Sequence, residues 1–343
     1  MKKLLLTYIF FLSGFFCLLL QAETTVVGSF LKYPVSAHVA ALGGNDVAFV
    51  GDDVNFAFCN PALLTVNTNK MINLNYSIYI AGSGYGSGSY SMKLSDIDAL
   101  AIAFQMADYG TFDGFDENGV ATSQFKAQNF ALSAIYSRVL NKYFTIGVAF
   151  KPIVSAYEQY SSYALAADLG IQYYDSESRL KVGFATRNIG VQFLGYDSDD
   201  EYSQNEMLPL EISVGVSKQL NHAPFAFHCT MQNLERWNYR YATNSSSSSE
   251  STDASNFAQV LLRHFIVGVD ILPPSNKFWL SVSYNFERGQ ELIVPDVFSL
   301  TGFSGGLGLK LNKFEIAVGV ASYHQAATTC HVSLSTNLSQ FGL

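Results

Sequence analysis

The chain has 343 residues, of which 14% are charged and 14% aromatic, and its 28 acidic residues outnumber its 20 basic ones. An ordinary soluble domain carries roughly 25% charged residues, so this composition argues against a secreted soluble sandwich. The acidic balance also argues against a nucleic-acid partner.

Residues 1–22 have the pattern of a signal peptide. Lys2 and Lys3 precede an apolar stretch over residues 4–20, and Ala22 is the small residue before the expected cut. An uncleaved membrane anchor is the alternative, and we favour cleavage because no cluster of Lys or Arg follows. No later stretch reaches the ~18 apolar residues of a spanning helix, so the exported chain is not expected to be a helical membrane protein.

Residues 23–70 precede the first expected strand and are too many to have no role. Small residues are frequent there. We therefore expect a periplasmic segment that can fold into a plug within a barrel lumen.

From Met71 onward, segment after segment alternates apolar residues with small or polar ones. In residues 72–80, for example, Ile, Leu and Tyr alternate with Asn and Ser. Successive side chains of a strand point to opposite faces, so each segment has one apolar and one small or wet face. This pattern, behind an export signal, predicts an all-β fold: a transmembrane antiparallel β-barrel of about 14 strands in the outer membrane. The expected strands cover residues 71–81, 85–94, 98–107, 128–139, 143–154, 163–174, 179–190, 208–219, 224–232, 262–272, 277–286, 300–311, 313–322 and 329–338.

The connections between these strands alternate short and long. Tight turns are expected at residues 95–97, 140–142, 175–177, 220–223, 273–276 and 312, and external loops at 82–84, 108–127, 155–162, 191–207, 233–261, 287–299 and 323–328. Such barrels have short periplasmic turns and longer external loops, and the sheet must close because lipid cannot satisfy a free strand edge. The barrel is thus expected over residues 71–338, with 233–261 as its longest external loop and 339–343 as a C-terminal tail.

The longest external loop contains the candidate partner-binding residues Arg236, Trp237 and Tyr239. Such residues are typical of binding hot spots, but an anchor at the membrane interface is an equally good interpretation. The serine-rich run at 244–253 is expected to be disordered.

Several charged residues fall on the inward faces of the expected strands: Lys151, Asp168, Lys181, Arg187, Glu211 and Glu315. Charge in a membrane barrel belongs in the lumen. These residues could line a channel, but we prefer internal salt bridges that fill the barrel.

No catalytic, cofactor or metal site stands out. The six histidines lack metal-ligand spacing, and no serine lies in a nucleophile motif with credible partners. We therefore expect a protein that is not an enzyme and needs no cofactor or metal. A hydrolase at the barrel rim, using His264 or His324, is improbable because nothing selects those residues.

Residues 30–44, FLKYPVSAHVAALGG, and residues 60–64, NPALL, resemble the N-terminal signature of the PorV/PorQ family. These are FadL-like outer-membrane barrels of the type IX secretion system of Bacteroidetes. Further stretches resemble the PorQ branch of that family, and they occur in order along nearly the whole mature chain. They are residues 160–162, 187–190, 222–225, 236–237, 261–265, 288–292 and 333–338.

The resemblance implies a fourteen-stranded FadL-like barrel whose N-terminal segment, with the motif Asn60-Pro61-Ala62, acts as a plug or hatch. It also implies a non-enzymatic role in the surface attachment complex, with outer-membrane lipid around the barrel and a PorZ-like surface protein as partner, alongside the PorU sortase and PorV. The alternatives are a FadL-like transporter of hydrophobic compounds and a PorV-like cargo shuttle.

Overall fold

The computed structural model describes residues 28–79, 82–116, 118–158, 160–195, 206–237, 253–275, 277–291, 299–324 and 327–342. The expected signal peptide, Tyr239 and nearly all of the serine-rich run lie outside the described residues.

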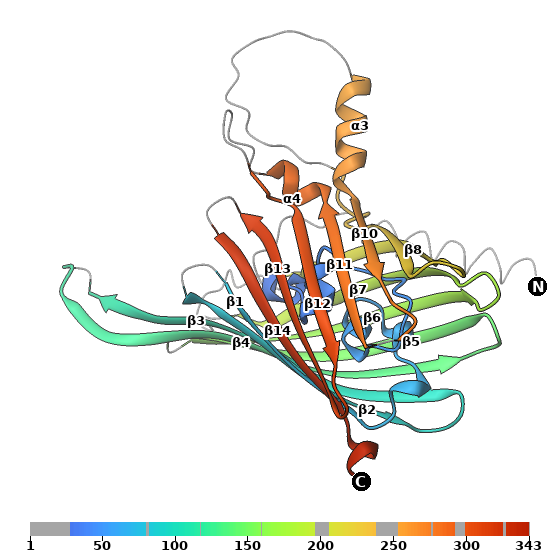
Figure 1. Cartoon of the computed structure of the whole chain (residues 1–343). Helices are drawn as coiled ribbons and strands as arrows, with labels where there is room; N and C mark the ends of the chain where they lie inside the picture. The colour runs from blue at the N-terminus through green and yellow to red at the C-terminus, as the bar shows by residue number, and fades with distance from the viewer. Residues whose placement is uncertain are drawn as a thin grey trace, which may run out of the picture.

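Fourteen antiparallel strands form a closed barrel in which every strand pairs with its neighbours in sequence, and β1 pairs with β14 to complete the ring (Figure 1). This confirms the predicted fold class. The strands are β1 (Met71–Ile78), β2 (Gly84–Lys93), β3 (Asp98–Phe115), β4 (Ala121–Val139), β5 (Phe144–Tyr157), β6 (Tyr160–Asp175), β7 (Leu180–Leu194), β8 (Glu211–Gln219), β9 (Phe225–Met231), β10 (Phe265–Ile271), β11 (Phe278–Asn285), β12 (Phe303–Lys310), β13 (Phe314–His324) and β14 (Ala327–Asn337).

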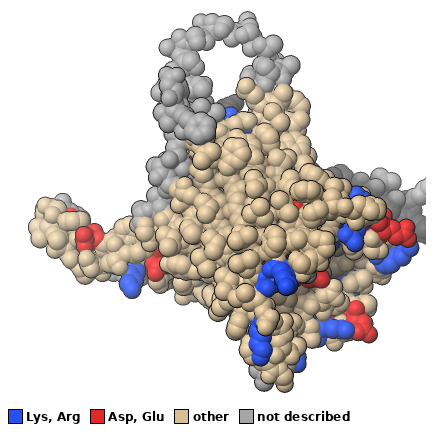
Figure 2. Space-filling model, viewed as in Figure 1, with Lys and Arg blue, Asp and Glu red and all other residues tan. Residues whose placement is uncertain are grey.

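The period of two places apolar side chains outside and polar ones inside. On β1, Leu74 and Tyr76 are more than half exposed, whereas Asn73 and Asn75 are buried. The face seen in Figure 2 is largely free of Lys, Arg, Asp and Glu, which gather near the turns and along the β3–β4 arm. A belt of exposed apolar side chains around a closed sheet is the surface that a barrel presents to lipid.

Among the described residues, no helix is long and apolar enough to cross a membrane. Two of the connections expected to be external contain short helices, α3 (Asp253–Arg263) and α4 (Phe286–Glu291). Both stand at the end of the barrel opposite the C-terminus (Figure 1).

The expected external loop over residues 108–127 is wrong. β3 continues to Phe115 and β4 begins at Ala121, so the two strands form a ribbon that ends in a tight turn. Within this ribbon Thr111 pairs with Lys126 and Phe112 with Phe125. The loop expected at 155–162 is likewise mostly strand, because β5 and β6 pair as far as Tyr157 and Tyr160.

The segment before β1 lies inside the barrel and is called the plug here (residues 28–70). It contains short helical turns, η1 (Ser29–Lys32), α2 (Ala37–Ala41), η2 (Val54–Phe58), η3 (Pro61–Leu63) and η4 (Val66–Thr68). Most of its side chains are buried against the inner wall. At the other end of the chain, η6 (Leu338–Phe341) follows β14 directly.

Candidate functional site

The Asn60-Pro61-Ala62 motif lies in the lumen and organises its own turn. Asn60 is fully buried, and its Oδ1 accepts a hydrogen bond of 3.0 Å from the Ala62 N–H, which starts η3. Its Nδ2 donates to the carbonyl oxygen of Val47 at 2.8 Å and to that of Ile171, on β6, at 3.3 Å. One amide side chain therefore links two parts of the plug to the barrel wall.

Glycines on the wall make room for this motif. Gly147 on β5 and Gly170 on β6 pair directly across the sheet. A Cβ on Gly147 would overlap the Pro61 backbone, and one on Gly170 would overlap Asn60 Oδ1. Only residues without a side chain allow such close approach of two backbones, so the wall and the motif fit each other.

A second set of glycines receives α2. A Cβ on Gly319 of β13 would lie 2.5 Å from the Ala37 carbonyl oxygen, and one on Gly306 of β12 would lie 2.7 Å from the Ala41 Cβ. The wall also donates hydrogen bonds to buried backbone carbonyls at the C-terminal end of the helix, from Ser283 to Ala41 at 2.7 Å and from Asn285 to Gly43 at 3.1 Å. The plug is thus seated at two separate places.

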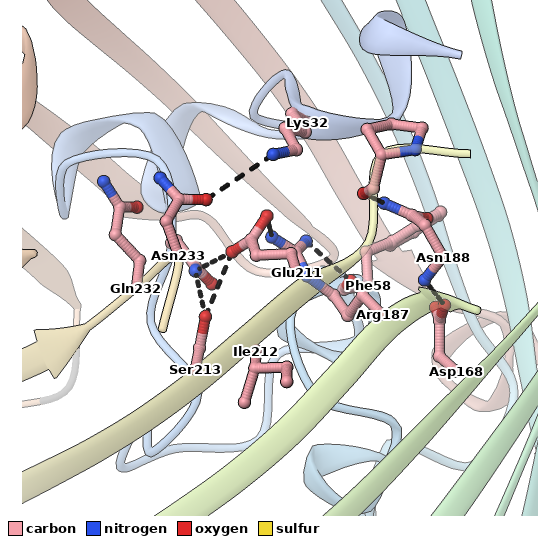
Figure 3. Close-up of polar contacts among 12 residues, drawn as sticks. Lys32, Phe58, Asp168, Arg187, Asn188, Glu211, Ile212, Ser213, Gln232 and Asn233 are labelled. Carbon is pink, nitrogen blue, oxygen red and sulfur yellow. Dashed lines mark hydrogen bonds and ion pairs between the residues drawn. The ribbon is translucent and has the colours of Figure 1, made fainter. Parts of the chain in front are cut away.

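The inward charges form internal ion pairs, as predicted. Arg187 Nη2 lies 2.6 Å from Glu211 Oε2, and Lys151 Nζ lies 2.8 Å from Asp168 Oδ2. Figure 3 shows how Arg187 also donates to the plug, at 3.1 Å from the Phe58 carbonyl oxygen. The side chains of these four charged residues are less than 10% exposed, and a buried charge needs such partners.

The two other predicted inward charges also have partners. Lys181 Nζ donates to the Phe49 carbonyl oxygen of the plug at 2.9 Å. Glu315 accepts from Trp279 Nε1 at 2.9 Å and lies 3.9 Å from Lys310 Nζ. A charged channel would need side chains that face open water. Lys181 and the two ion pairs instead bind groups of the wall or the plug, which argues against the channel interpretation.

A buried histidine–carboxylate cluster has no counterpart in the sequence predictions. His38 Nε2 of the plug lies 3.3 Å from Asp270 Oδ2 on β10, and His228 Nε2 on β9 lies 3.4 Å from the same oxygen. His228 Nδ1 lies 2.7 Å from Asp46 Oδ2, and His38 Nδ1 lies 3.7 Å from Asp53 Oδ2. Burial disfavours a charged imidazole, but Asp270 and Asp53 outweigh it and raise the pKa of His38 to about 9.

This cluster holds the plug to the wall by charge. The ring of His38 stacks on Trp279 with centroids 3.7 Å apart, which fixes its orientation. The described residues include no group of His, Cys, Asp and Glu arranged to hold a metal ion.

The described part of the lumen holds a small cavity beside the plug. This cavity of about 10 Å³ lies beside Tyr33, Pro34 and Tyr85. That is room for about one water molecule.

At the end of the barrel where α3 lies, Trp237 is 42% exposed and Phe257 of α3 is 59% exposed. Their rings stack with centroids 6.4 Å apart, and the Trp237 ring lies 4.4 Å from that of His264. Trp237 Nε1 donates to the Leu234 carbonyl oxygen at 2.7 Å, and the Arg236 N–H donates to that of Asn233 at 2.9 Å. Of the predicted partner-binding residues, the structure therefore places Trp237 on the surface, beside Arg236 at the base of α3.

The residues next to Trp237 are held firmly. Glu235 is buried and accepts a hydrogen bond of 2.8 Å from the Ile212 N–H at the start of β8. Burial raises the pKa of Glu235 to about 7. His264, one of the histidines considered for a rim hydrolase, is fully buried and its Nδ1 lies 2.8 Å from the Gln232 carbonyl oxygen.

No protein-family model matches the chain, and no curated protein matches it either. Among solved structures it is similar to the Pseudomonas putida toluene transporter TodX, a FadL-family barrel, with 12% sequence identity, a TM-score of 0.54, and coverage of 90% of this chain and 99% of that one. A TodX deltaS2S3 mutant, described as a monoaromatic hydrocarbon channel, gives 11% identity, a TM-score of 0.53, and coverage of 88% and 98%. These likenesses show a FadL-like barrel fold.

Proposed function

We propose that this protein is a non-enzymatic outer-membrane anchor of the type IX secretion attachment complex. Its barrel would be fixed in outer-membrane lipid, and its external surface would hold a PorZ-like surface protein, in company with the PorU sortase and PorV. The main observation in favour is the combination of a plugged lumen with an exposed aromatic patch on the external side. The resemblance of the sequence to the PorV/PorQ family supplies the identity of the complex.

The plugged lumen favours anchoring over passage. Plug and wall are joined by the Asn60 amide, the Arg187–Phe58 and Lys181–Phe49 bonds, and the histidine–carboxylate cluster around Asp270. A fixed plug makes the barrel a rigid base, and rigid scaffolds commonly present function on their loops.

The external aromatic patch is defined by the stacked rings of Trp237 and Phe257, which are 42% and 59% exposed. Exposed aromatic and aliphatic side chains that a fold does not bury are candidates for a protein interface. They stand at the external end of the barrel, where α3 and α4 project from it (Figure 1). A surface protein would meet them first.

The test is co-purification of the tagged protein from its native membrane in mild detergent. We expect wild type to recover the PorZ-like protein and the sortase, and Phe257→Ser to lose them by tenfold or more. Phe257 is chosen because its exposed ring is not needed by the barrel. Phe115→Ala is the matched control, since Phe115 is 65% exposed at the tip of the β3–β4 ribbon.

Equal recovery with Phe257→Ser and Phe115→Ala would reject this patch as the docking surface. Recovery of cargo proteins without the PorZ-like protein would instead support a PorV-like shuttle. Recovery of the barrel alone, in detergent that preserves other outer-membrane complexes, would overturn the anchor proposal.

A FadL-like transporter of hydrophobic compounds is the second candidate, motivated by the fold shared with TodX. Passage through the lumen would require the plug to move. The Ala48 Cβ lies 3.4 Å from the position of a Cβ on Gly215 of β8, close to the Cβ separation of a disulfide. A disulfide in the double variant Ala48→Cys, Gly215→Cys should therefore hold the plug against β8.

Uptake of a long-chain fatty acid by cells carrying the oxidised or reduced double variant separates the two functions. Transport would be established if wild-type cells take up the fatty acid, the oxidised variant does not, and reduction restores uptake. An anchor should retain its co-purifying partners in both redox states.

A further inference from the structure

Six tyrosines form a layer across the external mouth of the lumen, in ring contact from one side of the barrel to the other. Successive centroid separations along it are 6.3, 6.3, 4.4, 4.9 and 5.9 Å. In that order the tyrosines are Tyr157, Tyr109, Tyr85, Tyr33, Tyr79 and Tyr323. All but Tyr33 of the plug lie on strands or strand ends at the external side.

The guanidinium of Arg288, on α4, covers the end of this layer. Its Cζ lies 3.4 Å from the centroid of the Tyr323 ring. From the plug side, a Cβ on Gly44 would lie 3.4 Å from Arg288 Nη2 and 3.6 Å from the Tyr323 hydroxyl. Arg288 and Tyr323 thus lie next to the plug, and both residues are part-buried.

Two polar atoms at this point, Arg288 Nη1 and the Tyr323 hydroxyl, are buried and have no hydrogen-bond partner among the residues that the structure describes. Among the described residues no carboxylate lies within ion-pair distance of Arg288. The acid next to it, Glu287, accepts hydrogen bonds of 2.7 Å from Gln232 and from Asn233 instead. The other ionisable ring nearby is His331 of β14, whose centroid lies 6.2 Å from that of Tyr323.

Such an arrangement is costly unless something completes it. Native structures rarely leave a buried donor such as Arg288 Nη1 unpaired, and a part-buried guanidinium is more stable beside a counter-charge. Among the other inward cations, Lys151 and Arg187 each have a carboxylate within 3 Å, and Lys181 donates to the Phe49 carbonyl oxygen at 2.9 Å. Arg288 Nη1 has no such partner among the described residues.

We propose that Arg288 and Tyr323 form a binding site for an oxyanion, of which a phosphate group is the best fit. The guanidinium fork donates to two oxygens of such a group, and the Tyr323 hydroxyl donates to a third. The cation–π contact with Tyr323 keeps the fork in place. The phosphate can be free in solution or carried by a lipid headgroup.

The test measures the thermal midpoint of the full-length barrel in detergent with increasing inorganic phosphate. A ligand that binds only the folded state raises the midpoint with its concentration, so wild type should gain several degrees. Arg288→Met should abolish the gain, and Tyr323→Phe, which keeps the ring, should reduce it. Arg138→Met is the control, since Arg138 is a half-exposed arginine beside Asp98 at the opposite end of the barrel.

Two further readouts separate the sources of the phosphate. The source is a lipid headgroup if inorganic phosphate raises the wild-type midpoint only after delipidation. In that case wild type should also carry phospholipid that is missing from Arg288→Met. Wild type that responds directly identifies a free anion.

The proposal is overturned if Arg288→Met changes neither the rise in midpoint with phosphate nor the amount of co-purifying phospholipid. It is also overturned if Arg138→Met removes the response equally. A ligand-free Arg288→Met barrel that melts at or above the wild-type midpoint would support it, because the substitution removes a buried donor, Nη1, that has no partner among the described residues.

Discussion

At Gly170 the plug and the barrel wall meet without room for a methyl group. The Asn60 amide occupies the place of its missing Cβ, and the Ala62 N–H would lie 3.0 Å from that carbon. Two residues far apart in sequence thereby depend on each other, since Asn60 can cap η3 and bind the wall only where the wall has no side chain.

Gly170→Ala is expected to unseat the Asn60-Pro61-Ala62 motif. Overpacking of this kind costs about 1–3 kcal/mol, so the barrel should unfold at lower urea concentration or temperature. Gly86→Ala is the matched control on a strand, because the nearest side-chain atom to its Cβ, Met106 Cε, would be 3.8 Å away. Equal unfolding midpoints for the two variants would show that the barrel accommodates a methyl group at Gly170 without loss of stability.

The histidine–carboxylate cluster gives the plug a dependence on pH. The folded-state pKa of His38, about 9, lies above the ordinary value of 6.5. The stabilisation from its charged form is therefore complete below pH 6.5 and is lost as the pH rises through about 9.

We expect the thermal midpoint to fall between pH 7 and pH 10, and to fall less in His38→Gln. The decrease should not vanish in that variant, because His228 shares Asp270 and also faces Asp46. Melting curves across this range provide the measurement. Identical slopes for wild type and His38→Gln would exclude a contribution of His38.

Sequence could predict part of this chemistry. Lys151, Asp168, Arg187 and Glu211 were recognisable as inward charges because each falls on the polar phase of its strand. The cluster around Asp270 was not recognisable, since its members come from the plug and from two strands, 190 residues separating His38 from His228. Only the closed register of the barrel and the path of the plug bring them together.

At the scale of elements, the β3–β4 ribbon stands apart from the barrel. β2 stops opposite Asp108 and β5 stops opposite Ala127, so the ribbon beyond them has no further strand on either side. Residues 108–127 were expected to form an external loop because they lie between two segments with the alternating pattern. A strand with both faces in water has no alternation of buried and exposed positions. The sequence pattern therefore could not show how far β3 and β4 extend beyond the barrel.

Replacing residues 110–126 with Asn-Gly should leave the barrel intact. The ribbon contributes one backbone bond to the rest of the sheet, from the Glu158 N–H to the Lys126 carbonyl oxygen at 3.1 Å. The shortened hairpin should migrate as a folded barrel on unheated gels and melt within a few degrees of wild type. Loss of the folded band would mean that the ribbon supports β3 and β4 in the membrane.

At the scale of the whole molecule, a lipid-facing belt encloses a lumen filled by the protein's own N-terminal segment. Sequence predicted the belt well, because fourteen alternating segments leave few other folds. The filling of the lumen was an expectation from the length of residues 23–70 and from small residues there. How the plug seats, on glycines of β5, β6, β12 and β13, depends on contacts that no local pattern contains.

We expect the intact barrel to show no steady conductance in a planar bilayer. The cavity found in its described part holds about one water molecule, whereas the wall itself is polar and would suit a water-filled pore. A variant lacking residues 28–66 should, if it inserts, conduct ions. Steady conductance from the intact barrel at the level of that deletion variant would show that the plug does not seal the lumen.

The two seats of the plug lie on different parts of the barrel, and this bears on how the protein is made. η3 rests on β4, β5 and β6, whereas α2 rests on β11 to β14, which are synthesised last. Some of the earliest residues of the chain thus form the surface onto which its final strands assemble. Joining β14 to β1 closes the wall around the plug, so we expect seam closure and plug seating to be coupled during biogenesis.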